Sequence, residues 1–236
     1  WPATDLVEYI WLSVRHKFEL GEFLSLETAK THMLPIIEKY TNLEYRRVHG
    51  MALSLGLNVF EYGTNVTIGS GKYAYTVELD KLSYDDIVWD KIGEIPAVIV
   101  TGTNGKTTTV RLTRFICQAA NLMVGYCSTD WVMIGDEIIK HGDLTGPSGT
   151  QLVMMNPKVE VAVLELARGG ILRRGLLTNF VKASTVTNVS EDHMGEDGVD
   201  TVEELATAKG LVYKAIASDG YAIINLDDEL MREYSK

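Results

Sequence analysis

The first 94 residues show two hydrophobic patterns in succession. Three segments have apolar side chains at helical spacing: residues 5–16, a segment that starts at Ser25, and residues 43–55. Three short stretches with strand character follow: residues 57–62, 65–68 and 73–79. We expect Pro35 to interrupt the second helix, because proline removes a backbone donor, and Gly56 to end the third. Residues 1–94 therefore predict a small α+β region, whose role the sequence leaves open.

From residue 97 onward, strand and helix patterns alternate. We expect strands at residues 97–101, 122–127, 160–166, 183–188 and 221–225, a hairpin at 131–140, and helices at 106–120, 149–155, 201–216 and from about Asp228. Continuous apolar runs such as residues 161–164 are typical of a parallel sheet that is covered on both faces. Residues 95–236 therefore predict an α/β domain, a mostly parallel sheet with helices on both faces, which follows the small α+β region.

Composition excludes some classes of function. The chain has 236 residues and a net charge of −10, which argues against broad nucleic-acid binding, since that requires a basic surface. No apolar run approaches the ~20 residues of a membrane span. The only two cysteines, Cys117 and Cys127, are expected to be reduced core residues. We expect a cytoplasmic protein, and the sequence leaves a homo-oligomer open.

A glycine-bearing turn between a predicted strand and a predicted helix carries the main chemical signal. It lies within residues 97–109, AVIVTGTNGKTTT. Such a turn, with the helix N-terminus behind it, holds the phosphates of a nucleotide. Lys106 would reach the β- and γ-phosphates, and Thr107 would offer its hydroxyl to Mg²⁺. The strict P-loop pattern is not met, because Val100 occupies the place of its first glycine. We thus predict a P-loop-like site for ATP and Mg²⁺, formed by Gly102, Thr103, Asn104, Gly105, Lys106, Thr107 and Thr108.

Further polar residues follow other predicted strands. The carboxyl ends of parallel strands meet at one edge of the sheet, which would gather residues 101–107, 165–170, 188–193 and 225–228. A buried carboxylate is costly. Glu165 therefore either binds a metal ion or pairs with a cation such as Arg168. Arg168, Arg173 and Arg174 surround a glycine pair and suit carboxylate or phosphate recognition, a solvated loop being the alternative.

These motifs resemble one known family. The turn TGTNGKTTT resembles the ATP-binding loop of the Mur ligases, the ATP-dependent amide-bond ligases of peptidoglycan synthesis and their relatives. Three further motifs are similar to the cyanophycin-synthetase branch of that family: GDLTGPS at 142–148, LELARGGILRRGL at 164–176 and TNVSEDHM at 187–194. The resemblance covers about residues 95–236. Residues 57–77 are more weakly similar to the entrance of an ATP-grasp domain, and a simple α+β cap is the alternative.

The resemblance implies roles for individual residues. Glu165 and His193 would bind metal together with Thr107, and Asn225 would contact adenine. Lys209 matches a lysine that many Mur ligases carry as a carbamate. By themselves, His193 fits a surface residue and Lys209 a solvated helix lysine. Lys106, Glu165, His193 and Lys209 form the expected catalytic set. The expected substrate contacts are Thr145, Ser148, Arg168, Arg173 and Arg174.

The predicted activity is an ATP-dependent ligation of a carboxylate to an amine through an acyl phosphate. The substrates would be ATP, a small-molecule or peptide carboxylate, and an amine. The resemblance to the cyanophycin branch implies an aspartate-rich peptide as the carboxylate substrate and arginine or lysine as the amine. The alternatives are an ATP-binding module without catalysis and a P-loop kinase or switch. Mur ligases continue into a third domain that closes over the site. We therefore expect this chain, which stops at Lys236, to be a fragment truncated before that domain.

Overall fold

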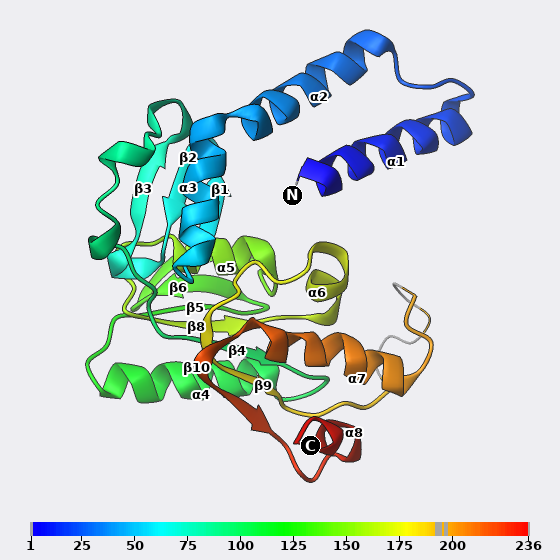
Figure 1. The fold of residues 1–236 in the computed structure, drawn as a ribbon. Coiled ribbons are helices and arrows are strands. Elements are labelled where there is room, and N and C mark those ends of the chain that lie inside the picture. Colours follow the sequence, from blue (N-terminus) through cyan, green and yellow to red (C-terminus); the bar gives the residue numbers. More distant parts are fainter. Residues whose placement is uncertain (1, 192–194, 196–197, 236) are drawn as a thin grey trace.

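The computed structural model describes residues 2–235, apart from 192–194, 196 and 197. Two helices at the N-terminus, α1 (Pro2–Leu20) and α2 (Leu26–Thr41), form an arm that extends away from the rest of the molecule (Figure 1). A third helix, α3 (Leu43–Ser54), runs from this arm to the body, and Asn42 caps it by accepting from the backbone N–H groups of Glu44 and Tyr45.

The expected interruption of α2 at Pro35 is wrong, because α2 continues to Thr41 with Pro35 inside it. A proline removes only one backbone hydrogen bond of a helix and bends it locally. The helical turns on either side of Pro35 keep their own bonds, so the element survives.

A small antiparallel sheet follows α3. Its strands are β1 (Val59–Tyr62), β2 (Asn65–Ile68) and β3 (Tyr75–Glu78), in the order β1-β2-β3. Apolar side chains of α3 and the sheet form a separate small core around Val48, Val66 and Ile68. Four short 3₁₀ helices accompany this sheet and lead to the main one: Gly71–Tyr73, Leu79–Lys81, Tyr84–Asp86 and Trp89–Lys91.

The main sheet has seven strands in the order β10-β9-β4-β8-β5-β6-β7. They are β4 (Ala97–Thr101), β5 (Val124–Cys127), β6 (Trp131–Ile134), β7 (Glu137–His141), β8 (Val161–Glu165), β9 (Val181–Val186) and β10 (Ile216–Ile224). The five strands β10, β9, β4, β8 and β5 run parallel to one another. At the far end β6 pairs antiparallel with β5, and β6 and β7 form the predicted hairpin. The predicted α/β class, with a small α+β region before a mostly parallel sheet, is confirmed.

Helices cover both faces of this sheet (Figure 1). They are α4 (Lys106–Ala119), α5 (Pro147–Met154), α6 (Arg168–Arg174), α7 (Val202–Gly210) and α8 (Glu229–Arg232), with a last 3₁₀ turn at Glu233–Ser235. Val110 of α4 packs with Val100 and Val163 on one face. Val153 of α5 packs with Ile99 on the other, as the alternation of side chains along a strand requires.

Two boundaries in the second half differ from the prediction. The helix expected at residues 201–216 ends at Gly210 and continues as a 3₁₀ helix, Leu211–Ala215, because Ile216 already pairs with Val181 as the first residue of β10. The helix α6 was not predicted, since Gly169 and Gly170 lower helix propensity. At Gly170, however, a side chain would approach the carbonyl oxygen of Thr145 to 3.1 Å, so close packing favours glycine there.

Hydrogen bonds cross the predicted boundary at residues 94 and 95. Ser70 accepts from the backbone N–H of Ile95 at 3.0 Å, and the backbone N–H of Lys72 donates to the carbonyl oxygen of Val159 at 2.9 Å. The division into regions 1–94 and 95–236 stays a prediction. No helix in the described part of the chain is both long enough and apolar enough to span a bilayer.

We predict that Gly71→Ala destabilises the fold by several kcal/mol more than Gly63→Ala. Both glycines have positive φ, +54° and +59°, so alanine costs about 1–2 kcal/mol at either position. Only at Gly71 would the new Cβ lie 2.4 Å from the carbonyl oxygen of Val159, which lies in the loop between α5 and β8. Urea unfolding of the two variants and the parent measures the difference. Equal losses would mean that this contact between the two sheets contributes nothing.

Candidate functional site

The strands β4, β8 and β9 lie side by side and end at the same edge of the main sheet. The turn of residues 102–105 leaves β4 there and leads into α4. Gly102 has φ +144°, and a Cβ on it would lie 1.9 Å from Oγ1 of Thr187. Gly105, with φ +80°, is the residue that precedes α4. Both positions therefore require glycine, for space at Gly102 and for backbone conformation at Gly105.

The segment after β9 holds this turn in place. The backbone N–H groups of Thr103 and Asn104 donate to the carbonyl and side-chain oxygens of Asn188, at 2.9 and 3.0 Å. In return, the Asn188 amide and the Thr187 hydroxyl donate to the carbonyl oxygen of Asn104, at 3.0 and 2.6 Å. The Thr103 side chain also exchanges hydrogen bonds with Ser190. Thr103 and Asn104 thus fix the shape of the turn.

The first turn of α4 carries the lysine and hydroxyls of the motif. Lys106 donates from Nζ to the carbonyl oxygen of Thr103 at 2.9 Å, and the Thr107 hydroxyl donates to Oε1 of Glu165 at 3.0 Å. Thr108 is exposed. The first backbone N–H groups of a helix have no partner within the helix, so this terminus can accept an anion.

Glu165, the last residue of β8, is fully buried. Burial raises the pKa of this carboxyl group, which the hydrogen bond from Thr107 and the charge of Lys106 oppose. Its other oxygen, Oε2, has no hydrogen-bond partner. Among the interactions found for the described residues, the alternative ion pair with Arg168 does not occur. A buried carboxylate oxygen without a partner is satisfied by a further hydrogen-bond donor or by a cation.

The predicted metal ligands Thr107 and Glu165 therefore lie together, and their hard oxygen atoms fit Mg²⁺. The third, His193, lies outside the described residues. Within residues that the structure describes, no group of three or more His, Cys, Asp or Glu side chains is arranged to hold a metal ion. The structure thus brings two of the three predicted ligands together, and their role as metal ligands stays a prediction.

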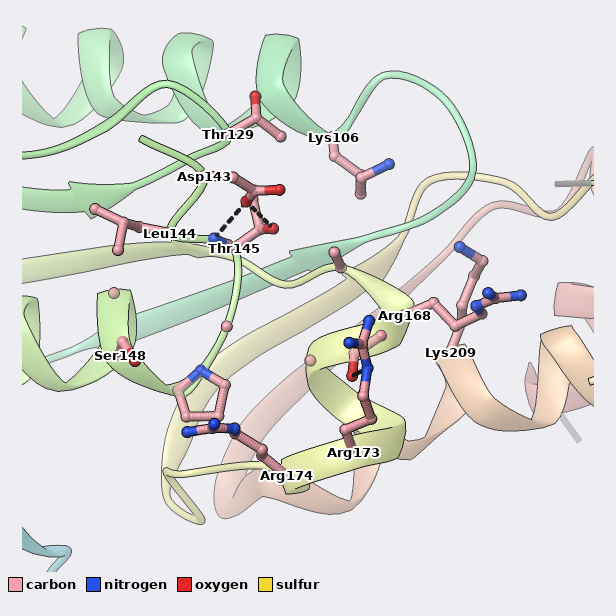
Figure 2. Close-up of a pocket in the computed structure, with 16 residues that line it drawn as sticks. Lys106, Thr129, Asp143, Leu144, Thr145, Ser148, Arg168, Arg173, Arg174 and Lys209 are labelled. Atoms are coloured by element: carbon pink, nitrogen blue, oxygen red, sulfur yellow. Dashed lines mark hydrogen bonds between the residues drawn. The ribbon is translucent and has the colours of Figure 1, made fainter. Parts of the chain in front are cut away.

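A cavity of about 560 Å³ opens between Lys106 and α6 (Figure 2). Its cationic lining residues are Lys106, Arg168, Arg173, Arg174 and Lys209, and Thr145 and Ser148 also line it. Among the described residues of the lining, Asp143 is the one acidic side chain, and it accepts from the backbone N–H and the hydroxyl of Thr145, at 3.1 and 2.6 Å. Among the described residues of this lining, basic side chains outnumber acidic ones, whereas the chain as a whole is acidic.

The cationic residues differ in their surroundings. Arg168 is buried at the start of α6, whereas Arg173 and Arg174 are exposed in its last turn. Arg173 donates from Nε to the carbonyl oxygen of Gly169 at 3.2 Å. Lys209 of α7 is buried and donates from Nζ to the carbonyl oxygen of Gly102 at 3.0 Å. Lys209 is therefore not the solvated helix lysine of the alternative prediction.

Asn225 follows β10, beside this edge of the sheet but not in the cavity lining. Its amide nitrogen donates to the carbonyl oxygen of Thr187 at 2.8 Å, and its side-chain oxygen accepts from the backbone N–H of Asp227 at 3.1 Å. One N–H and one oxygen lone pair of this amide stay available. Asp228 caps α8 by accepting from the backbone N–H groups of Leu230 and Met231.

Sequence reasoning missed three residues of the site. Asp143 accepts from the backbone N–H of Thr145 and so shapes this turn. An aspartate commonly bonds the backbone N–H two residues after it, so the sequence spacing could have indicated this role. Thr129, in the cavity lining, follows the carboxyl end of β5, where the strand-end rule could have found it. Asn188 stood in a noted motif without a role, and only its contacts with Asn104 give it one.

Comparison with known proteins agrees with this geometry. Residues 100–236 match the model of the Mur ligase middle domain. The chain is similar to the cyanophycin synthetase of Geminocystis herdmanii, with 47% identity over 142 residues, which are 60% of this chain and 16% of that protein. It is also similar to the UDP-N-acetylmuramoyl-L-alanyl-D-glutamate–2,6-diaminopimelate ligase of Chlorobaculum tepidum, with 34% identity over 55% of this chain and 26% of that protein.

A solved structure of a UDP-N-acetylmuramoyl-L-alanyl-D-glutamate–2,6-diaminopimelate ligase has a similar fold. The TM-score is 0.50 at 26% sequence identity, over 60% of this chain and 29% of that one. The matches thus span less than a third of each of these proteins. They confirm the resemblance predicted from the motifs.

We predict that the free energy of unfolding of the ligand-free parent falls relative to Glu165→Gln as pH rises. A carboxyl group with a raised pKa in the folded state stabilises below its unfolded pKa of about 4.3, and this contribution is lost as pH rises through the folded pKa. Each unit of pKa shift corresponds to roughly 1.4 kcal/mol. Denaturant unfolding from pH 4 to about pH 8 measures the trend.

Glu160→Gln is the control with the opposite sign. The backbone N–H of Met123 and the Lys72 ammonium lower the pKa of Glu160, so the parent should gain stability over this variant as pH rises. If Glu165→Gln behaved like Glu160→Gln, the Glu165 carboxylate would have to be stabilised by a structural ion pair.

Proposed function

Since the chain belongs to the Mur ligase family, we propose that it forms the ATP-binding core of a ligase that joins a carboxylate to an amine. The observation that carries the proposal is the hydrogen-bonded pair of half-buried Thr107 and buried Glu165 beside Lys106. A hydroxyl, a carboxylate with an unpaired oxygen and a lysine meet at a helix N-terminus. Together they suit the phosphates of a nucleotide and the cation that accompanies them.

The nucleotide's phosphates lie against the first turn of α4. The N–H groups of Thr103 and Asn104 are occupied by Asn188, so the turn keeps its shape without a ligand. The backbone N–H groups of Lys106, Thr107 and Thr108 are left to meet the anion. Lys106 exchanges its bond to the Thr103 carbonyl for one to a phosphate oxygen. Asn225 holds the adenine edge with the hydrogen-bonding capacity that Thr187 and Asp227 leave.

Thr107 and Glu165 would hold Mg²⁺, with His193 as the predicted third ligand, and the ion would supply positive charge to the phosphates. Lys106 offsets the charge that develops on the transferring phosphoryl group. Lys209 donates to the carbonyl oxygen of Gly102 and so holds the first residue of the turn in place.

The cavity beside Lys106 takes the carboxylate substrate. Arg168, Arg173 and Arg174 orient it through their guanidinium groups, with Thr145 and Ser148 as hydroxyl donors. An oxygen of this carboxylate attacks the γ-phosphorus, and ADP leaves. The amine nitrogen then attacks the acyl carbon, phosphate leaves with the acyl C–O electrons, and loss of a proton from nitrogen completes the amide.

The substrate is an acidic peptide and the amine is a basic amino acid. The similarity to cyanophycin synthetase supports this choice, and the guanidinium groups of the lining suit carboxylate recognition. An assay of ADP release with aspartate-rich peptides plus arginine or lysine tests the proposal. ATP binding without substrate-stimulated turnover would favour the alternative of a binding module without catalysis.

We predict that Lys106→Ala abolishes measurable binding of Mg·ATP and lowers any turnover by on the order of 10²–10³-fold, because it removes a charge aligned with the phosphates. Lys72→Ala is the matched control. Lys72 pairs with Glu160, which precedes β8, so its loss should leave ATP binding unchanged. Calorimetric titration with Mg·ATP measures both. Equal affinity of the Lys106→Ala variant and the parent would refute the site.

A further inference from the structure

The N-terminal helix α1 carries an apolar stripe on the side opposite α2. The side that faces α2 is marked by Tyr9, which is buried and whose ring stacks on His32 at 5.6 Å between centroids. Val7, Trp11, Val14 and Phe18 follow one another at intervals of four, three and four residues, which places them along one line of the helix, away from Tyr9.

This stripe is exposed in the structure. Phe18 is 87% exposed, Trp11 66% and Val7 63%, while Val14 is half-buried. Alternating intervals of three and four residues are typical of the seam between two paired helices. An exposed seam of this kind, on an arm that extends from the body, indicates a surface that pairs with another helix (Figure 1).

We propose that α1 pairs in antiparallel orientation with α1 of a second copy of this chain. Side-chain size supports this choice. In an antiparallel pair Val7 faces Phe18 of the second copy, and Trp11 faces its Val14, so that each layer of the seam combines one aromatic ring with one valine. A parallel pair would place Trp11 against Trp11 and Val7 against Val7, which crowds one layer and leaves a void in the next.

Charge supports the same orientation. Glu8 and Arg15 flank the stripe on one side, since they follow Val7 and Val14 directly, and Arg15 also pairs with Glu19 of its own helix at 2.7 Å. In an antiparallel pair Glu8 of each copy lies near Arg15 of the other, and the two-fold symmetry repeats the contact. These complementary charges reduce the repulsion that two chains of net charge −10 would otherwise experience.

The expected dimer is weak. The interface involves one helix of 19 residues from each copy, which is small compared with the ~800 Å² per partner of a standard interface. We expect a dissociation constant on the order of micromolar. The dimer is independent of the ATP site, since α1 lies on the arm, so the two proposals can fail separately.

Sedimentation equilibrium of the chain at about 5 to 200 µM, a range that brackets micromolar affinity, tests the pairing. We expect a reversible monomer–dimer equilibrium that Phe18→Glu shifts to monomer by at least about 10-fold in dissociation constant, because it puts a charge in an apolar seam. Leu20→Glu is the matched control, at a neighbouring exposed leucine off the stripe, and should dimerise like the parent. A monomeric parent, or a Phe18→Glu variant that still dimerises, would overturn the proposal.

Disulfide cross-linking tests the orientation. In a Cys117→Ser background, which removes the half-buried cysteine, a mixture of Val7→Cys and Phe18→Cys chains should form a cross-linked dimer on oxidation. Val7→Cys alone should not, because antiparallel pairing separates the two copies of residue 7. Efficient cross-linking of Val7→Cys to itself would show parallel helices and refute the antiparallel pair.

Discussion

The hydrogen bond between Thr107 and Glu165 joins the two elements on which the site depends. It connects the first turn of α4 to the end of β8, across the face of the sheet where Val100 and Val163 pack. A buried carboxylate raises the energy of the ligand-free state, since one of its oxygens has no partner. The fold keeps it nonetheless. Such a group is expected where a cation is to bind, because the same desolvation that raises its pKa strengthens its attraction to Mg²⁺.

The shape of the phosphate-binding turn depends on a neighbour that is distant in sequence. Asn188 and Thr187 satisfy the backbone groups of Thr103 and Asn104, so the turn is held before any nucleotide arrives. Preorganisation of this kind lowers the entropy lost on binding. It is possible because β4 and β9 are adjacent parallel strands, whose following segments leave the sheet at the same edge.

Charge is distributed unevenly over the molecule. Five cationic side chains line the cavity beside Lys106, in a chain whose net charge is −10. A cluster of this sign attracts anionic groups locally. Among the described residues of the arm of α1 and α2, the outward stripe of α1 carries no such charge cluster, and its side chains are apolar and suited to packing against another helix.

The cytoplasmic location stays a prediction. The buried thiol of Cys127, whose pKa burial raises to about 12, is unreactive as a thiolate.

The sequence by itself determined the α/β class and the position of the turn before α4, because apolar periodicity and the glycines of the turn are local properties. Lys106 and Thr107 were predicted from the motif of this turn, and Glu165 from its place at the end of a strand. Other features required the tertiary structure. The helix α6 forms despite Gly169 and Gly170, since Gly170 packs against the carbonyl oxygen of Thr145, and no local propensity predicts that contact. The partners of Asn188 and Lys209 lie 84 and 107 residues away, so only the folded chain reveals what these two residues hold.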